Sequence, residues 1–476
     1  MSSFESNVVA NYQTVEYNKF VQITNNTQFP AVSVTRFNSP NVAGLQPVSS
    51  VDVYPKYAIL VKNVDSTSAN YSGNMNMTSD AFGRTRMSAP LTLFDSSHRF
   101  ADNNLWSTLT GGTTTTSASA QFLSAQGLVE LKVDALSGSK IYRETTKVFA
   151  YQPGKSLQIM STFTFNQAKS GLRQRVGYYG AENGIYLELD DNTLYMVERS
   201  ITSGTLSATR IPKSLWNIDR LDGSGPSGIT LDITKAQILF MDIEWLGLGT
   251  VRTGFVINGQ FVPCHYFHHA NLIDSTYITT ASLPLRYEIE NKAATSSPSR
   301  LKQVCSTVIS EGGYELRGLQ QAASIPINAP INFADANIYY PIISIKLRTD
   351  RLDAIIILTA LSILGAGDNK VYNWQVRASG TTTGGQWLSA GPDSAVQYNI
   401  NGVSFAGGRI LASGYVSSNN QSSASVDILK EALFKFQLER NYFTSTPYEL
   451  TLVAAANSSS GTNGMYASMD WEEISR

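Results

Sequence analysis

Short stretches in which apolar and polar residues alternate recur along the whole chain and are separated by clusters of turn-forming residues. Runs rich in Val, Ile, Thr, Tyr and Phe, bounded by Gly, Asn, Asp and Ser, are typical of β-strands. Helical periodicity is confined to residues 427–437, where a pair of strands is an open alternative. Strands are predicted at Lys147–Tyr151, Leu157–Phe165, Gly184–Leu189, Thr193–Arg199, Gln237–Trp245, Thr253–Ile257 and Leu285–Ile289.

Two turn signals set the spacing of these strands. Asp190-Asp191-Asn192 separates one pair of runs, and Asn258-Gly259 separates another. Asn-Gly between alternating runs is a strong hairpin signal, because both residues tolerate positive φ. Strands that follow one another without intervening helices favour a sandwich or jelly roll. The sequence therefore predicts the all-β class.

Composition divides the chain into three sections. Residues 1–80 are rich in Asn and Ser with sparse apolar runs, so we expect an extended, anchoring section that gains order from a neighbour. Residues 81–318 carry the regular strand rhythm and are predicted to form the central sandwich. Residues 319–324 are expected to be a linker, because prolines follow closely. Residues 325–476 are expected to form a second, C-terminal β domain.

The charge balance excludes several classes of function. Lys and Arg number 36 against 37 Asp and Glu, which gives a net charge of −1. A nucleic-acid-binding protein needs a basic surface, and so does a polybasic membrane anchor. We therefore expect neither nucleic acid nor membrane as a partner. Charged residues make up 15% of the chain, below the roughly 25% of typical soluble domains, so Ser, Thr, Asn and Gln carry much of the polarity.

Cysteines and apolar runs give further expectations. Cys264 and Cys305 are too few for a disulfide framework; two buried thiols are favoured, and one bridge remains open. The longest apolar run, Ala354–Gly365, is shorter than the roughly 20 residues of a membrane-spanning helix, which predicts a buried core segment. The first residues lack the pattern of a signal peptide, so none is expected. Phosphate-binding and nucleophile-elbow motifs are missing, and no cofactor is expected.

The most chemically suggestive residues are Asp242 and Glu244. On a strand, residues two apart share a face at about 6.6–6.8 Å, within the range of the paired carboxylates of glycosidases. The strand resembles that of laminarinase- and lichenase-type glucanases, in which Glu-x-Asp-x-Glu begins with the nucleophile and ends with the acid/base. Phe240 occupies the nucleophile position here. We therefore expect hydrogen bonds on a half-polar sheet face, with a glycan- or ion-binding groove and catalysis as alternatives.

Three of the four histidines lie in the run CHYFHHAN at residues 264–271. The spacing of His265 and His269 suits zinc on a helix, but Pro263 and the hairpin before it predict a strand. On a strand these two side chains lie about 13 Å apart, too far for one metal ion. No metal is expected. His265 and His269, with Asp242, Glu244 and Trp245, remain candidates for glycan or ion binding.

Aromatic residues offer another candidate surface. Sugar rings stack on aromatic side chains, although core packing is favoured for most aromatics in a sheet protein of this composition. The candidates for a sugar platform are Tyr178, Tyr179, Trp216, Trp245, Tyr266 and Tyr287.

The central section also carries a series of recognisable sequence words. The run at 80–96, DAFGRTRMSAPLTLFDS, resembles the AFGR-x-R-x-S-x-P-x-TLFDS opening of structural proteins of tailed bacteriophages, cyanophages among them, and of some large algal DNA viruses. Further words follow in the same order as in that family. They lie at residues 143–156, 173–188, 216–255, 267–291 and 302–315.

This resemblance covers roughly residues 80–318, half of the chain, and implies a virion structural protein with a concanavalin-like or jelly-roll sandwich. A double-stranded DNA virus is implied, a tailed phage being favoured. The protein would be displayed on the capsid as a minor or decoration protein, or belong to a fibre or tail appendage. The expected partners are major capsid or tail proteins, further copies of the chain and host-surface glycans. Enzymatic activity is not expected; a receptor-binding lectin and a polysaccharide depolymerase are the alternatives.

Overall fold

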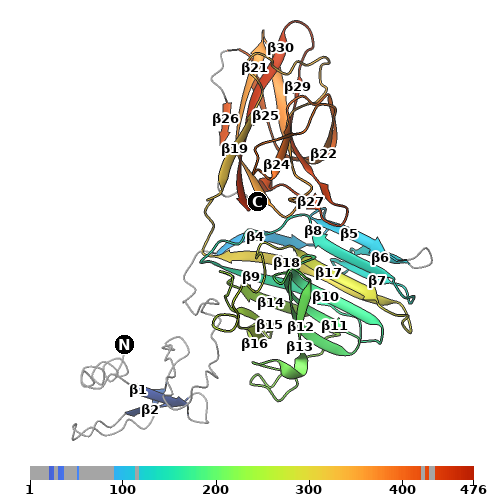
Figure 1. Cartoon of the computed structure of the whole chain (residues 1–476), viewed down its shortest axis with the longest axis vertical. Coiled ribbons are helices and arrows are strands. Elements are labelled where there is room, and N and C mark those ends of the chain that lie inside the picture. Colours follow the sequence, from blue (N-terminus) through green and yellow to red (C-terminus); the bar gives the residue numbers. More distant parts are fainter. Residues whose placement is uncertain are drawn as a thin grey trace. The chain divides into compact units, whose positions relative to one another are not determined.

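The computed structural model describes residues 90–112, 117–419 and 435–475, and it describes 21–25, 31–36, 51–52 and 424–427 by their backbone (Figure 1). The chain divides into two compact units, Met1–Asn76 and Met77–Arg476. In the first unit, β1 (Val21–Asn25), β2 (Ala31–Arg36) and β3 (Val51–Asp52) form an antiparallel sheet. Most of the section predicted to act as an anchor, residues 1–80, lies outside the described residues, as does the start of the word at 80–96.

Two antiparallel sheets form the central region of the second unit. The first has the order β13-β12-β11-β10-β17-β8-β5 and comprises β5 (Trp106–Gly111), β8 (Lys140–Thr145), β10 (Leu172–Tyr179), β11 (Gly184–Asp190), β12 (Thr193–Ser200), β13 (Ser207–Pro212) and β17 (Leu285–Asn291). The second has the order β16-β15-β14-β9-β18-β7-β6, with β4 also paired to β18. It comprises β4 (Pro90–Ser97), β6 (Ala118–Leu123), β7 (Leu128–Val133), β9 (Ser156–Thr164), β14 (Gln237–Ile243), β15 (Val251–Ile257), β16 (Gln260–Phe267) and β18 (Ser299–Glu311).

Alternation along each strand decides which side chains enter the core between these sheets. On β14, Leu239, Met241 and Ile243 join the core cluster, and the residues between them face the other side of the sheet. Both predicted turns are confirmed. Asn258 and Gly259 adopt positive φ between β15 and β16, and Asp191 does so between β11 and β12. The all-β class and the central two-sheet sandwich are therefore confirmed.

The C-terminal region forms further antiparallel sheets around a second core. One sheet has the order β19-β30-β21-β26 and comprises β19 (Leu319–Ser324), β21 (Ile355–Gly367), β26 (Ala424–Asp427) and β30 (Asn463–Ser475). The next has the order β23-β24-β20-β29-β22-β25 and comprises β20 (Tyr340–Leu347), β22 (Val371–Thr383), β23 (Leu388–Ser389), β24 (Val396–Asn399), β25 (Ser404–Ser417) and β29 (Glu449–Ala456). A two-stranded sheet contains β27 (Arg440–Asn441) and β28 (Thr446–Pro447).

The structure tests several of the predictions made from the sequence. The linker predicted at 319–324 was wrong: these residues form β19, because β30 supplies a backbone partner that the local sequence does not reveal. The apolar run at 354–365 lies largely in β21, where Ile355 to Leu358 are fully buried. Cys264 and Cys305 are free thiols. The helical pattern predicted at 427–437 lies mostly outside the described residues.

Helices contribute little to the described part of the chain. The short 3-10 helix η2 (Lys213–Leu215) follows β13. Within the described ranges, no helix has the length and apolar character needed to cross a membrane.

The C-terminal region contacts the sandwich through buried charges and a small apolar cluster. Arg440, at the start of β27, lies 2.8 Å from the carboxylate of Glu144 on β8 and 2.9 Å from that of Asp353. Its backbone N–H donates to the Thr146 carbonyl at 2.9 Å. The apolar cluster beside it comprises Val148, Ala150, Ile355 and Ile357. The buried Arg440–Glu144 pair and the apolar cluster therefore join the two β regions, whereas the pair with Asp353 lies within the C-terminal region.

We expect Arg440→Ala to destabilise the full-length protein by about 3–5 kcal/mol, because it leaves the buried carboxylate of Glu144 with one cation fewer. Guanidinium chloride unfolding, followed by tryptophan fluorescence, measures this. Arg300→Ala is the control: Arg300 is 57% exposed and lies 3.6 Å from Glu130, so its loss should cost less than about 1 kcal/mol. Equal losses for the two variants would contradict a stabilising role for the buried contact.

Candidate functional site

The carboxylates singled out in the sequence lie in buried surroundings. Asp242 is fully buried on β14 and forms an ion pair with Arg252, its register partner on β15. Glu244 follows the end of β14 and is also fully buried. Phe240 is buried with its ring edge-on to Phe261, at 5.1 Å between centroids. The Asp242 carboxylate is thus neutralised by a cation inside the protein.

The two candidate histidines have separate environments. His265 on β16 is buried, and its Nδ1 accepts from the Asn217 backbone N–H at 3.4 Å. Burial lowers the pKa of His265 to about 4, so this ring is neutral at neutral pH. His269 lies beyond β16, with Nδ1 2.7 Å from the Gly249 carbonyl and Nε2 2.7 Å from the Glu198 carboxylate. Over the ranges that the structure describes, no cluster of three or more His, Cys, Asp or Glu residues is arranged to hold a metal ion.

The aromatic candidates belong mostly to the protein interior. Trp245 keeps partial exposure; its Nε1–H donates to the Ile278 carbonyl at 3.2 Å and its ring meets Tyr151 edge-on. Tyr179 is buried on the face of the seven-stranded sheet that points away from the core, within a small cluster of tyrosines. The remaining aromatic candidates for a sugar platform are also buried, namely Tyr178, Trp216, Tyr266 and Tyr287.

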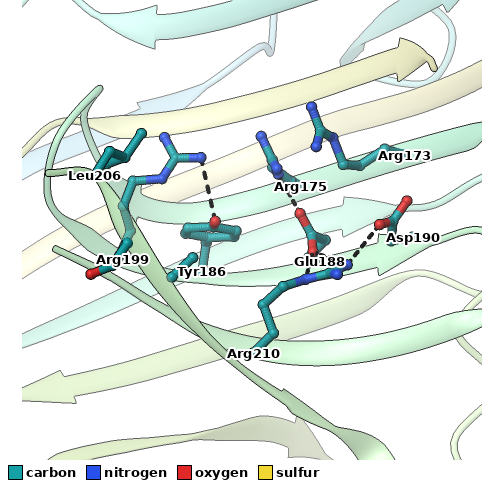
Figure 2. Close-up of a pocket in the computed structure, with 10 residues that line it drawn as sticks. Arg173, Arg175, Tyr186, Glu188, Asp190, Arg199, Leu206 and Arg210 are labelled. Atoms are coloured by element: carbon teal, nitrogen blue, oxygen red, sulfur yellow. Dashed lines mark hydrogen bonds and ion pairs between the residues drawn. The ribbon is translucent and has the colours of Figure 1, made fainter.

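A pocket that the sequence did not reveal lies over β10 to β13, on the outer face of the seven-stranded sheet. Figure 2 shows the charged and aromatic side chains that surround it. Its volume is about 240 Å³. Four arginines, two carboxylates and one tyrosine line it, together with Leu206, Ser207 and Ala208. We call it the arginine pocket; its charged and aromatic residues are Arg173, Arg175, Arg199, Arg210, Glu188, Asp190 and Tyr186.

Strand register brings these side chains onto one face. Arg175 on β10 is paired in register with Glu188 on β11 and with Glu288 on β17. Arg173 is paired in the same way with Asp190 and Glu290. Oppositely charged side chains directly across neighbouring strands stabilise a sheet. The period-two pattern of charge in RQR and LELD was the signal in the sequence, but the pairing between strands was not visible there.

Two glycines make room for a tyrosine pair beneath the guanidinium groups. Gly177 is opposite Tyr186, and Gly184 is opposite Tyr179. A Cβ atom on Gly177 would lie 2.6 Å from the Tyr186 Cβ, and one on Gly184 would lie 2.2 Å from the Tyr179 Cβ. The two tyrosine rings are 4.4 Å apart between centroids. Any side chain at either glycine would displace a ring.

Glu188 links two of the pocket arginines. Its carboxylate accepts from Nε of Arg175 at 2.5 Å and from Nε of Arg210 at 2.6 Å. Arg210 also contacts Asp190 at 2.7 Å, and Arg175 contacts Glu288 at 3.2 Å. These contacts hold the guanidinium groups in fixed orientations, as the dashed lines in Figure 2 show for Glu188.

Arg199 has a different set of partners. Its Nη1 donates to the carbonyl oxygens of Gly180 at 3.2 Å and Ala181 at 3.4 Å. Its Nη2 donates to the Tyr186 hydroxyl at 3.3 Å. The guanidinium lies 5.1 Å from the centre of the Tyr186 ring and 5.4 Å from that of Tyr179, within cation–π range.

Two carboxylates around the arginine pocket, Glu288 and Asp190, stay ionised at neutral pH. Burial opposes ionisation of Glu288, but Arg286, Arg175 and Arg199 together outweigh it and lower the pKa of Glu288. Burial likewise opposes ionisation of Asp190, and Lys292 and Arg210 lower its pKa. Ionised carboxylates only accept hydrogen bonds, so the donors on this face come mainly from guanidinium groups. Such an arrangement suits binding of a ligand rich in oxygen acceptors.

Comparison with known proteins identifies no family. No protein-family model matches the sequence, and no curated protein matches it. Solved structures give weak similarities. A Bacteroides ovatus mixed-linkage glucan GH16 protein is 9% identical, with 45% of this chain and 99% of that chain covered and a TM-score of 0.31. A Mycobacterium marinum β-1,3-glucanase is 11% identical, with 46% and 98% covered and a TM-score of 0.31.

A third similarity concerns a phage protein. The CBM2 module of the evolved Dit of Lactobacillus casei BL23 phage J-1 is 6% identical, with 48% of this chain and 98% of that chain covered and a TM-score of 0.30.

We expect the contribution of Glu288 to stability to depend on pH. Because folding lowers the pKa of Glu288, this contribution is complete above its ordinary pKa of 4.5 and is lost as the pH falls through the folded-state value. Glu288→Gln should cost about 3 kcal/mol at pH 7, and the difference from wild type should shrink below pH 4.5. Urea unfolding at a series of pH values measures this.

Glu315→Gln is the matched control, because its carboxylate is 58% exposed and pairs with the exposed Arg317. Its effect should stay below about 1 kcal/mol at every pH. A difference between wild type and Glu288→Gln that stays constant from neutral to acidic pH would contradict ionisation of Glu288 in the folded protein.

Proposed function

We propose that this chain is a structural protein of a double-stranded DNA virus particle, a tailed phage being favoured. It acts by non-covalent binding, as a minor or decoration protein on the capsid or as part of a fibre or tail appendage. Its partners are major capsid or tail proteins and further copies of itself, and it contacts host-surface glycans through the arginine pocket. Its location is the virion.

A single observation supports this proposal: two of the sequence words that resemble those of virion proteins contribute residues to the pocket and to the contact between the β regions. The word at 173–188 spans most of β10 and β11 and supplies Gly177 and Gly184 together with arginines of the pocket. The word at 143–156 supplies Glu144 and Val148, which contact the C-terminal region. The two words therefore supply residues to the pocket and residues that hold the two β regions together.

The buried carboxylates support binding in preference to hydrolysis. A retaining glycosidase needs a nucleophile and an acid/base about 5–5.5 Å apart on either side of the bond that is cleaved. Here Phe240 stands at the nucleophile position, and Asp242 is paired with Arg252 in the interior. A lectin-like receptor-binding role remains the second candidate, because the arginine pocket is an open site with oriented donors.

Mass spectrometry of purified particles tests the virion role. We expect the full-length chain in particles at a fixed ratio to the major capsid or tail proteins, and its absence from purified particles would contradict the proposal. Deleting residues 1–79, which lie largely outside the described residues, should leave a folded protein that is no longer incorporated. Deleting residues 325–476 is the comparison. If the variant without residues 1–79 is incorporated normally and the variant without residues 325–476 is not, the C-terminal region anchors the protein to the particle instead.

We expect the purified protein to release no reducing sugar from mixed-linkage or β-1,3-glucans, because the nucleophile position holds Phe240. Glu244→Gln and Asp242→Asn serve as controls. Asp242→Asn should lower the melting temperature, since it removes the carboxylate that pairs with buried Arg252. Hydrolysis by the wild type that Glu244→Gln abolishes, without a change in melting temperature, would establish an enzyme instead.

A further inference from the structure

We propose that the arginine pocket binds a saccharide unit that carries one carboxylate, as in a uronic acid, and that Arg199 receives this carboxylate. The assignment rests on the glycan contact proposed above and adds the class of sugar and the residue that selects it.

Arg199 differs from the other arginines that line the pocket in its partners. Arg173, Arg175 and Arg210 each contact at least one carboxylate of the protein. Within the part of the chain that the structure describes, the hydrogen-bond partners of Arg199 are neutral, and no carboxylate lies within ion-pair distance of it. Arg199 is therefore the lining arginine at which, among the described residues, a ligand carboxylate can form a direct ion pair.

The orientation of Arg199 is fixed before any ligand arrives. Three hydrogen bonds to described residues use Nη1 twice and Nη2 once, so two of the five N–H groups of the guanidinium remain, one of them on Nε. The Nε–H can donate to a carboxylate oxygen, and the charges on both groups strengthen such a hydrogen bond. The Tyr186 and Tyr179 rings beneath the guanidinium restrict its movement. Preorganisation of this kind reduces the entropy lost on binding.

The remaining walls suit one sugar ring. The volume of about 240 Å³ lies below the roughly 300–1,000 Å³ of pockets for drug-sized ligands. Leu206 is 57% exposed and provides an apolar wall for the C–H face of a ring. Ser207 and Ala208 belong to β13, an edge strand of the sheet. An edge strand presents backbone N–H and C=O groups that can bond to sugar hydroxyls.

Isothermal titration calorimetry with the full-length protein tests this assignment. The probes are a galacturonic acid trisaccharide, its carboxyl-reduced neutral counterpart and a sulfated galactose trisaccharide. We expect the acid to bind at least about tenfold more tightly than the neutral sugar, because a charge-assisted hydrogen bond contributes more than a neutral one. Arg199→Gln should remove this preference, and Arg300→Gln, on the other sheet of the sandwich, should leave it unchanged.

A second variant keeps the test independent of folding. Leu206→Asp places a negative charge at an exposed wall of the pocket, and Leu206→Asn is its neutral match. We expect Leu206→Asp to weaken binding of the acid about tenfold relative to Leu206→Asn, with both proteins melting at the wild-type temperature.

The possible outcomes separate the two levels of the proposal. Equal binding of acidic and neutral sugars, lowered by Arg199→Gln, would overturn the acidic class and leave the glycan contact standing. Tighter binding of the sulfated sugar, or equal binding by Leu206→Asp and Leu206→Asn, would also overturn the assignment. Absence of binding to all three sugars by the wild type would overturn both the assignment and the proposed glycan contact at this pocket.

Discussion

The structure depends on a continuous series of ion pairs that crosses the outer face of the seven-stranded sheet. Cations alternate with carboxylates along the series, and its members come from several strands of this sheet and from the C-terminal region. Because most members are buried, removal of one leaves a charge that water cannot solvate, at a cost of about 3–5 kcal/mol. The series runs from β13 to the C-terminal region through Arg210, Glu188, Arg175, Glu288, Arg286, Glu144, Arg440 and Asp353.

This series connects the arginine pocket with the contact between the two β regions, whose residues lie far apart in the sequence. At one end Arg210 and Arg175 line the arginine pocket, and at the other Arg440 joins the C-terminal region to the sandwich. Tyrosine rings lie beneath several of the guanidinium groups, and Gly177 and Gly184 provide the space for them. Packing of rings and pairing of charges therefore fix the same side chains. A rigid surface of this kind suits recognition, in which orientation of donors before binding limits the entropy cost.

Local patterns in the sequence were sufficient for much of the fold. Alternation and turn residues predicted most of the named strands of the central sandwich, since both signals depend on neighbouring residues. The strand predicted at Lys147–Tyr151 was wrong, because β8 ends at Thr145. The strand at residues 319–324 was not predicted, because it forms only against β30, which lies more than a hundred residues later in the sequence. The pairing of Asp242 with Arg252 was missed for a similar reason, as it depends on the register between β14 and β15. The arginine pocket combines four strands, and no single stretch of sequence contains it.

The candidate sites show what could not be predicted from the sequence alone. Asp242, His265 and His269 attracted attention because their residue types are common in catalysis and metal binding. In the folded protein each meets partners from distant segments, such as Arg252, Asn217 and Glu198. What these side chains can bind or catalyse depends on such partners, and the spacing of residues along one strand does not reveal them.

The central claim is that the chain works as a rigid binding unit on a virus particle, with the arginine pocket presented to the surroundings. A cryo-electron microscopy reconstruction of particles that contain the chain tests this most directly. The account predicts density for the sandwich on the particle exterior, with Arg199 and Leu206 accessible to solvent. Density that places the face over β10 to β13 against a capsid or tail subunit would contradict it.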